Sequence, residues 1–346
     1  MSRWVPDPDS VSDPKNLKNP DGLGAVLASS SGPGLETRTG RSSKVQLYPF
    51  WIRLIPFFLS ALMFLSAFFS VFSPLPLLFL RLTSGVRWFW LAIFCNSALV
   101  LLAAGSASLV LYLVFIVSVV LALGEGLSRG KSLERTGTLA LSAILGAAIG
   151  GLFLHSAIHH LSPLVAIRQE VSGLVEVMTQ TMAASPAEVR TSLVGDVPVD
   201  EWKDRLLSEL PSAVSVFALL LVAINLIIIF RANPNGLRQR LRLDAGYLRH
   251  WKAPEFLVWP TILTGFLLLL DLGPGADFLT AVFKFLMAIY VLQGLSVLSF
   301  VFDVWKIRGF FRTVGVLVAV FLMMPLLLSM GFFDLWFDFR SKLRQS

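Results

Sequence analysis

Residues 211–230 form a continuous apolar run, PSAVSVFALLLVAINLIIIF, that contains no charged residue. A helix rises about 1.5 Å per residue, so roughly 20 apolar residues cross a hydrocarbon core about 30 Å thick. Backbone groups inside lipid must bond to one another, which leaves helices and closed β-barrels as the spanning structures. Barrel strands alternate apolar and polar residues, and this run does not alternate. The run therefore predicts a membrane-spanning helix.

Similar runs recur along most of the chain. The composition agrees with this, because 55% of the residues are hydrophobic and only 15% are charged, against about 25% charged in soluble domains. We predict an all-α, polytopic transmembrane bundle of about eight spans plus one short segment, residues 74–82, broken by Pro74 and Pro76. The predicted spans are 50–72, 86–104, 107–127, 137–161, 211–230, 255–270, 278–302 and 314–333.

Polar segments flank and interrupt this transmembrane domain, which we place at residues 49–340. Residues 1–48 have too few large apolar side chains to offset the entropy of ordering, so they are predicted to be disordered. Residues 341–346 form a short polar tail, and residues 162–210 form an amphipathic, helical segment. This segment either covers the bundle surface or closes over a binding cavity.

Lysines and arginines predict the orientation, because loops rich in them stay in the cytoplasm. Three such regions, 129–135, 231–252 and 306–312, fall on the same side of the membrane when the spans are counted. Segment 162–210 then lies outside. Arg38, Arg41 and Lys44 favour a cytoplasmic N-terminal tail, which requires 74–82 to make a short pass and leaves the C-terminal tail outside.

The net charge of +7 fits basic cytoplasmic loops, so no nucleic-acid partner is expected. The single cysteine, Cys95, excludes a disulfide framework. His155 and His159 share a helical face, but no carboxylate or cysteine completes a metal site beside them. We expect no cofactor, no metal and no enzymatic activity, because no catalytic constellation lies within the spans.

Three amides, Asn96, Asn225 and Gln293, lie near the middle of predicted spans. Polar groups at this depth are costly and mark either a helix contact or a functional site. Lys284 lies one to two turns inside its span. It either reaches the interface or balances Asp271, Asp277 or an anionic ligand. These four residues are the candidate ligand-binding set.

A charged and aromatic stretch, Gly331–Arg340, ends the last predicted span. Asp334 and Asp338 are four residues apart and share a helical face. Two interpretations remain: an interfacial anchor whose charges face water, or an aspartate that pairs with an arginine elsewhere, such as Arg81 or Arg87. In either case Asp334, Asp338 and Arg340 are structural or interface residues.

The order of several short blocks resembles the YybS-like family of bacterial membrane proteins, whose function is not established. The blocks are SPLPL (73–77) with Arg81 and Gly85, EGLSRGKS (125–132), Leu210-Pro211 leading to Asn225, Trp259-Pro260, LQGL (292–295) and GFFDLWFDFR (331–340). The family is also similar in its hydropathy and Pro/Gly pattern to the substrate-capture subunits of vitamin transporters. This resemblance implies a multi-pass protein of the bacterial cytoplasmic membrane.

Two functional hypotheses follow. The first is a subunit that binds or transports a small solute, motivated by the mid-span amides, the Pro-broken segment and the outer segment. The second is a structural or assembly protein that anchors other membrane proteins through its basic loop and tails. The lipid bilayer is a partner in both.

Overall fold

The computed structural model describes residues 55–183, 199–244, 246–270 and 275–345. The prediction for residues 1–48 and part of that for residues 162–210 lie outside this part of the chain. The described residues contain helices and no strand, so the all-α prediction is confirmed. The helices are α2 (Pro56–Leu65), α3 (Pro74–Thr83), α4 (Val86–Leu111), α5 (Ser118–Ser128), α6 (Leu133–Ile158), α7 (Pro163–Ala183), α9 (Val199–Ala232), α10 (Leu237–Arg240), α11 (Val258–Leu268), α12 (Ala276–Val304), α13 (Phe310–Leu322), α14 (Met324–Phe337) and α15 (Phe339–Gln345).

Four described helices are long and apolar enough to cross a membrane, and a fifth crossing results if the bent pair α13–α14 counts as one. They are Val86–Ser128, Leu133–Ile158, Asp204–Ala232 and Ala276–Val304. The first contains Gly105 with φ 80° and ψ −176°, a non-helical conformation that separates two helices. This break matches the predicted boundary between spans 86–104 and 107–127. The count of eight spans stays a prediction, because the remaining apolar helices are shorter.

The first apolar block is not the single span expected for residues 50–72. In the described part of this block, the helix ends at Leu65, and Ala67 has a positive φ of 54°. Ten residues of α2 extend only about 15 Å, roughly half of the hydrocarbon core. Pro74 then starts α3. We call α2 and α3 with their turn the first hairpin (residues 56–83).

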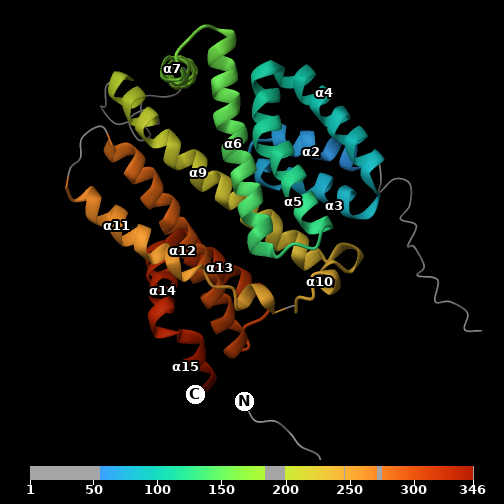
Figure 1. The fold of residues 1–346 in the computed structure, drawn as a ribbon, viewed down its shortest axis with the longest axis vertical. Coiled ribbons are helices and arrows are strands. Elements are labelled where there is room, and N and C mark those ends of the chain that lie inside the picture. The colour runs from blue at the N-terminus through green and yellow to red at the C-terminus, as the bar shows by residue number, and fades with distance from the viewer. Residues whose placement is uncertain (1–54, 184–198, 245, 271–274, 346) are drawn as a thin grey trace, which may run out of the picture. The chain divides into compact units, whose positions relative to one another are not determined.

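Both arms of the first hairpin meet the same end of the bundle (Figure 1). Phe57, near its start, packs edge-on against Trp88 at the start of α4. Near its end, the Leu82 carbonyl accepts a hydrogen bond from Asn235 in the basic loop. The turn between the arms instead contacts the apolar middle of α9, where Asn225 bonds to the Val71 carbonyl. The hairpin therefore enters the bundle and returns without crossing it.

The last predicted span, 314–333, is also broken. Helices α13 and α14 meet at an angle of 96°. Met323 leaves the helical conformation (φ −120°, ψ 29°), and a proline, Pro325, opens the first turn of α14. We call α13 and α14 the second hairpin (residues 310–337).

The second hairpin also starts and finishes at one end. Arg312, at its start, pairs with Asp303, which also pairs with Arg249. Just past its end, Arg340 donates to the carbonyl of Trp251, two residues from Arg249. The C-terminal helix α15 therefore lies against the basic loop, whereas the sequence placed the C-terminal tail on the opposite side of the membrane.

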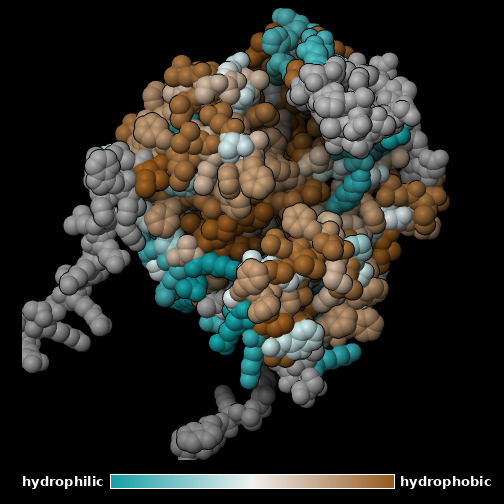
Figure 2. Space-filling view, turned by 180° about the vertical axis from the view of Figure 1, so that it is seen from behind, coloured by the Kyte–Doolittle hydropathy of each residue, from teal (hydrophilic) through white to brown (hydrophobic). Residues whose placement is uncertain are grey.

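The three basic regions meet as the span count predicted. Glu134 accepts a hydrogen bond from Tyr247, and Arg249 pairs with Asp303 at 2.7 Å. Burial, with the Glu134 carboxylate as a second cause, raises the pKa of Tyr247 to about 12. Helix α7 lies at the other end of the bundle (Figure 1). Figure 2 shows hydrophilic residues gathered mainly at the two ends of one face, with a broad hydrophobic surface between them.

The outer segment is helical where it is described. Helix α7 covers residues 163–183, and Val171 and Val175 on its apolar face are each 4% exposed. The later part of this segment, from Val199, belongs to α9. Helix α9 continues without interruption into its membrane span and carries Pro211 inside it.

Candidate functional site

Asn96 is fully buried and bonds to the first hairpin. Its Nδ2 donates to the carbonyls of Pro56 and Ala92, and its Oδ1 accepts from the N–H of Ala61 at 2.7 Å. The side chain thus supplies partners to the backbone of a short helix that begins inside the bundle. Asn96 is a helix-to-helix contact.

Asn225 does the same for the turn of this hairpin. Its Nδ2 donates to the carbonyl of Val71 at 2.8 Å and to that of Leu221 in its own helix. Ser60 and Ser73 exchange hydrogen bonds with each other's carbonyls across the same turn, and Ser60 also bonds to Tyr112. Irregular backbone at membrane depth is tolerated where protein satisfies it, and these side chains do so.

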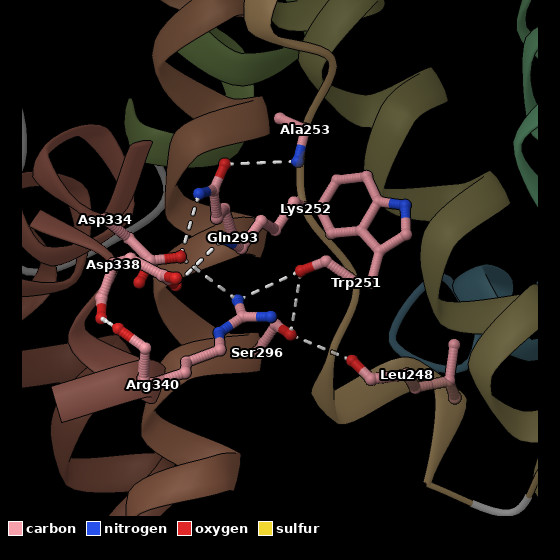
Figure 3. A network of polar contacts seen from close by, with 10 residues as sticks. Leu248, Trp251, Lys252, Ala253, Gln293, Ser296, Asp334, Asp338 and Arg340 are labelled. Atoms are coloured by element: carbon pink, nitrogen blue, oxygen red, sulfur yellow. Dashed lines mark hydrogen bonds and ion pairs between the residues drawn. The ribbon is translucent and has the colours of Figure 1, made fainter. Parts of the chain in front are cut away.

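Gln293 belongs to a network at the basic end (Figure 3). Its Oε1 accepts from the N–H of Ala253 at 3.1 Å, and its Nε2 donates to Asp334 at 3.2 Å. Asp334 is fully buried and lies 3.4 Å from the guanidinium of Arg340, which is 5% exposed. The interpretation that Asp334 faces water is therefore wrong. Its partner is Arg340 rather than Arg81 or Arg87, and Arg81 pairs with Glu125.

Arg340 also closes the loop onto the bundle. It shares the carbonyl of Trp251 with the hydroxyl of Ser296. Burial lowers the pKa of the Arg340 guanidinium, and the carboxylates of Asp334 and Asp338 oppose that effect. Asp334 Oδ1 and the Nε and NH1 atoms of Arg340 have no hydrogen-bond partner among the described residues.

Asp338 differs from Asp334 because about half of its side chain is exposed. It accepts a hydrogen bond from Lys252 at 2.9 Å. This bond lowers the pKa of the Asp338 carboxyl below its ordinary value of 3.8. Asp338 therefore forms a surface ion pair across from the buried one.

Two glycines allow α12 and α14 to touch. A Cβ added at Gly294 would lie 2.0 Å from the carbonyl oxygen of Leu327, and one at Gly331 would lie 1.9 Å from that of Tyr290. Both obstacles are backbone atoms, so no side chain can move aside. The close contact places Asp334 within reach of Gln293.

Lys284 pairs with Glu209 rather than with Asp277. Its Nζ lies 2.5–2.6 Å from both carboxylate oxygens of Glu209 on α9. Asp277 is described and has no contact with it, and Asp271 lies outside the described residues. Lys284 therefore links α12 to α9.

A cavity of about 620 Å³ lies at the outer end of the bundle, between α7, α9 and the start of α12. Its lining residues are Leu164, Ile167, Arg168, Glu201, Asp204, Arg205, Leu207, Ser208, Leu210, Pro211 and Asp277. Sequence reasoning missed this site. Its charged residues come from three separate segments, and only the mixed charges of 201–205 give a local signal.

A smaller cavity of about 410 Å³ lies beside His155, His159 and Glu170. The two imidazole rings are tilted by 47° to each other with centroids 4.5 Å apart, and His155 lies 3.8 Å from Glu170. Within the described ranges, no group of three or more His, Cys, Asp or Glu side chains could hold a metal ion. Neither cavity is lined by Asn96, Asn225, Gln293 or Lys284.

Long apolar helices, hairpins that return to one side and polar ends define a multi-pass helical membrane protein. A family model described as a predicted membrane protein (DUF2232) matches residues 52–335. The chain therefore belongs to this family. No curated protein and no solved structure matches the chain.

Proposed function

We propose that this chain is a solute-binding subunit of a membrane transport system, and that its solute binds at the outer end of the bundle. The observation behind this proposal is the cavity between α7, α9 and α12. Its volume of about 620 Å³ falls within the 300–1,000 Å³ typical of small-molecule sites. Apolar and charged side chains both line it, as in sites that hold a solute and orient it.

This proposal moves the site away from the residues first considered. Asn96, Asn225 and Gln293 are each fully buried and bond to backbone groups, and Asn225 Oδ1 is the one polar atom of these amides without a partner among the described residues. Lys284 is committed to Glu209. A solute site among these four would have to break contacts that hold the bundle together.

The resemblance in hydropathy and Pro/Gly pattern to the substrate-capture subunits of vitamin transporters supports the same class of function. The resemblance to the YybS-like family supports the cytoplasmic membrane of a bacterium as the location. That the chain is not an enzyme stays a prediction.

A thermal-shift screen of small metabolites on the purified, detergent-solubilised protein tests the proposal. A hit should stabilise the protein, and Ser208→Trp, which fills the cavity, should abolish the shift. The matched control is Gln180→Trp, because Gln180 is exposed on α7 and lines neither cavity. Hits that are unaffected by Ser208→Trp would place the site elsewhere.

A structural or assembly role is the second candidate. The observation that favours it is the joining of three basic regions at one end, where Arg231, Arg240 and Arg242 stay exposed. Under this alternative, no solute stabilises the protein, and Arg240→Gln with Arg242→Gln releases membrane proteins that co-purify with the wild type. Retention of those proteins by the double variant would contradict it.

A further inference from the structure

Five charged residues line the outer cavity, but two of them neutralise each other. Arg205 lies 2.6 Å from Glu201, one turn away on α9. Opposite charges held at this distance satisfy each other before any solute arrives. Glu201 and Arg205 therefore contribute little net charge to the cavity.

Lys284 is also unavailable to the cavity. Lys284 lies on α12, the helix that carries Asp277, and the sequence suggested it as the counter-charge of Asp277 or of an anionic ligand. The structure instead bonds it to both oxygens of Glu209, which also accepts from the Ser212 hydroxyl. Asp277 is left without that cation.

Three lining charges remain: Arg168 on α7, Asp204 on α9 and Asp277 on α12. None of them forms an ion pair with another described residue. Among the described lining residues, two carboxylates against one guanidinium leave an unbalanced negative charge. The two carboxylates come from different helices, so a group between those helices can contact both.

We infer that the cavity takes a small solute with a cationic amine or ammonium group, which lies between Asp204 and Asp277. This inference rests on the proposed function and names the chemical class of its solute. The hydrocarbon part of the solute packs against Leu207, Leu210 and Pro211 on α9. Arg168 faces the same cavity and binds a carboxylate of the solute, so a zwitterion fits better than a simple anion.

Cysteine chemistry tests the charge of the cavity without knowledge of the solute. Cys95 is the only cysteine, so Cys95→Ala provides a cysteine-free background. Ser208→Cys then reports from the cavity and Gln180→Cys from an exposed position on α7. Each is reacted with two methanethiosulfonates of similar size, one bearing trimethylammonium and one bearing sulfonate.

The ratio of the two rates should favour the cationic reagent at residue 208 by about tenfold relative to residue 180. One unbalanced charge about 6 Å away in water changes each rate about threefold, in opposite directions for the two reagents. Asp277→Asn or Asp204→Asn should bring the ratio near its value at residue 180, and Arg168→Gln should raise it. Equal ratios at both positions would overturn the inference.

Protection of residue 208 from the uncharged reagent methyl methanethiosulfonate then tests binding with three probes that share one hydrocarbon body. Phenethylamine and phenylalanine should slow the modification, and 3-phenylpropionate should not. Asp204→Asn should remove the protection by both amines, and Arg168→Gln should weaken phenylalanine alone. Protection by the anion only would overturn the solute class while the cavity remained a binding site. Failure of these probes and of every hit from the metabolite screen to protect residue 208 would overturn the proposed function itself.

Discussion

The two helical hairpins enter the bundle from the same end but are held in different ways. In the first, α2–α3, side chains from the long helices bond directly to the hairpin backbone, as Asn225 does at Val71 and Asn96 at Ala61. In the second, α13–α14, backbone contact at Gly294 and Gly331 brings the helices together. A buried ion pair then fixes its end.

This difference shows two solutions to one physical problem. A helix that turns back inside a membrane exposes carbonyl and N–H groups that lipid cannot satisfy. The first hairpin meets this need with amides and hydroxyls near its turn. The second bends by 96° with proline at the start of α14, and its polar contacts lie where the chain returns to water.

The largest expected effect concerns sidedness. Because both hairpins return to the end where they started, residue 235 and the C-terminus should lie on one side of the membrane and residue 162 on the other. Reporter insertions at residues 162 and 235 and a fusion at the C-terminus measure this directly. A C-terminal reporter on the side of residue 162 would show that α13–α14 crosses the membrane and does not return to the side on which it starts.

The sequence predicts the first break but not the second. Pro74 and Pro76 lie close to serines in SPLPL, and the block around them is too long for one helix. Pro325 lies within an apolar run of ordinary span length, so hydropathy conceals the bend there. Pro74 and Pro325 have the same role, because each lies in the first turn of a helix that follows a break.

Asp334, at the other end of α14, shows a second limit. The sequence places it at the end of a span, where a carboxylate can face water or pair inside. Its contacts, Gln293 and Arg340, depend on how α12 packs against α14, and no local spacing encodes a contact across 41 residues. The mid-span amides were easier, because depth alone predicts that such groups bond between helices. The outer cavity lies between three helices, so it could be recognised only once the positions of those helices were known.

Removal of one partner of the buried ion pair should have the largest effect on stability. Asp334→Leu leaves Arg340 buried without its carboxylate, which costs about 3–5 kcal/mol of the free energy of unfolding. The double variant Asp334→Leu with Arg340→Met should recover most of this loss, because no buried charge remains. Denaturant titration in detergent provides the measurement. A single variant as stable as the wild type would mean that the pair is open to water.

The close contact in the second hairpin should be nearly as sensitive. Gly331→Ala forces a Cβ against the carbonyl of Tyr290, so α14 must move away from α12 at a cost of about 1–3 kcal/mol. Gly146→Ala is the matched control, because a Cβ at Gly146 meets nothing within 4 Å. Thermal melts of both variants compare them, and equal stabilities would indicate that the helices are further apart.

In the first hairpin, amide replacements should cost less. Asn96→Leu removes the bonds that its amide forms with the carbonyl of Pro56 and the N–H of Ala61, a loss of about 2 kcal/mol. Outside its own helix, Asn225 bonds only to the Val71 carbonyl. Asn225→Leu should therefore cost about 1 kcal/mol of the free energy of unfolding. Melting temperatures of the two variants give the order. A larger loss for Asn225 would mean that the turn depends more on α9 than on α4.

The smallest effect is expected for the exposed ion pair of the second hairpin, Asp338 with Lys252. The pKa of Asp338 is lowered in the folded protein, so the pair stabilises the fold above the ordinary value of 3.8 and loses this contribution as pH falls below it. Both side chains are partly exposed, so the contribution is under about 1 kcal/mol and weakens with salt. Asp338→Asn should therefore melt slightly below the wild type at pH 6, and the gap should close as the pH falls below 3.8. A difference in melting temperature that persists at the lowest pH would show that the new amide disturbs the turn after α14. The variant Lys252→Gln separates the two causes, because it removes the ion pair and leaves that turn unchanged.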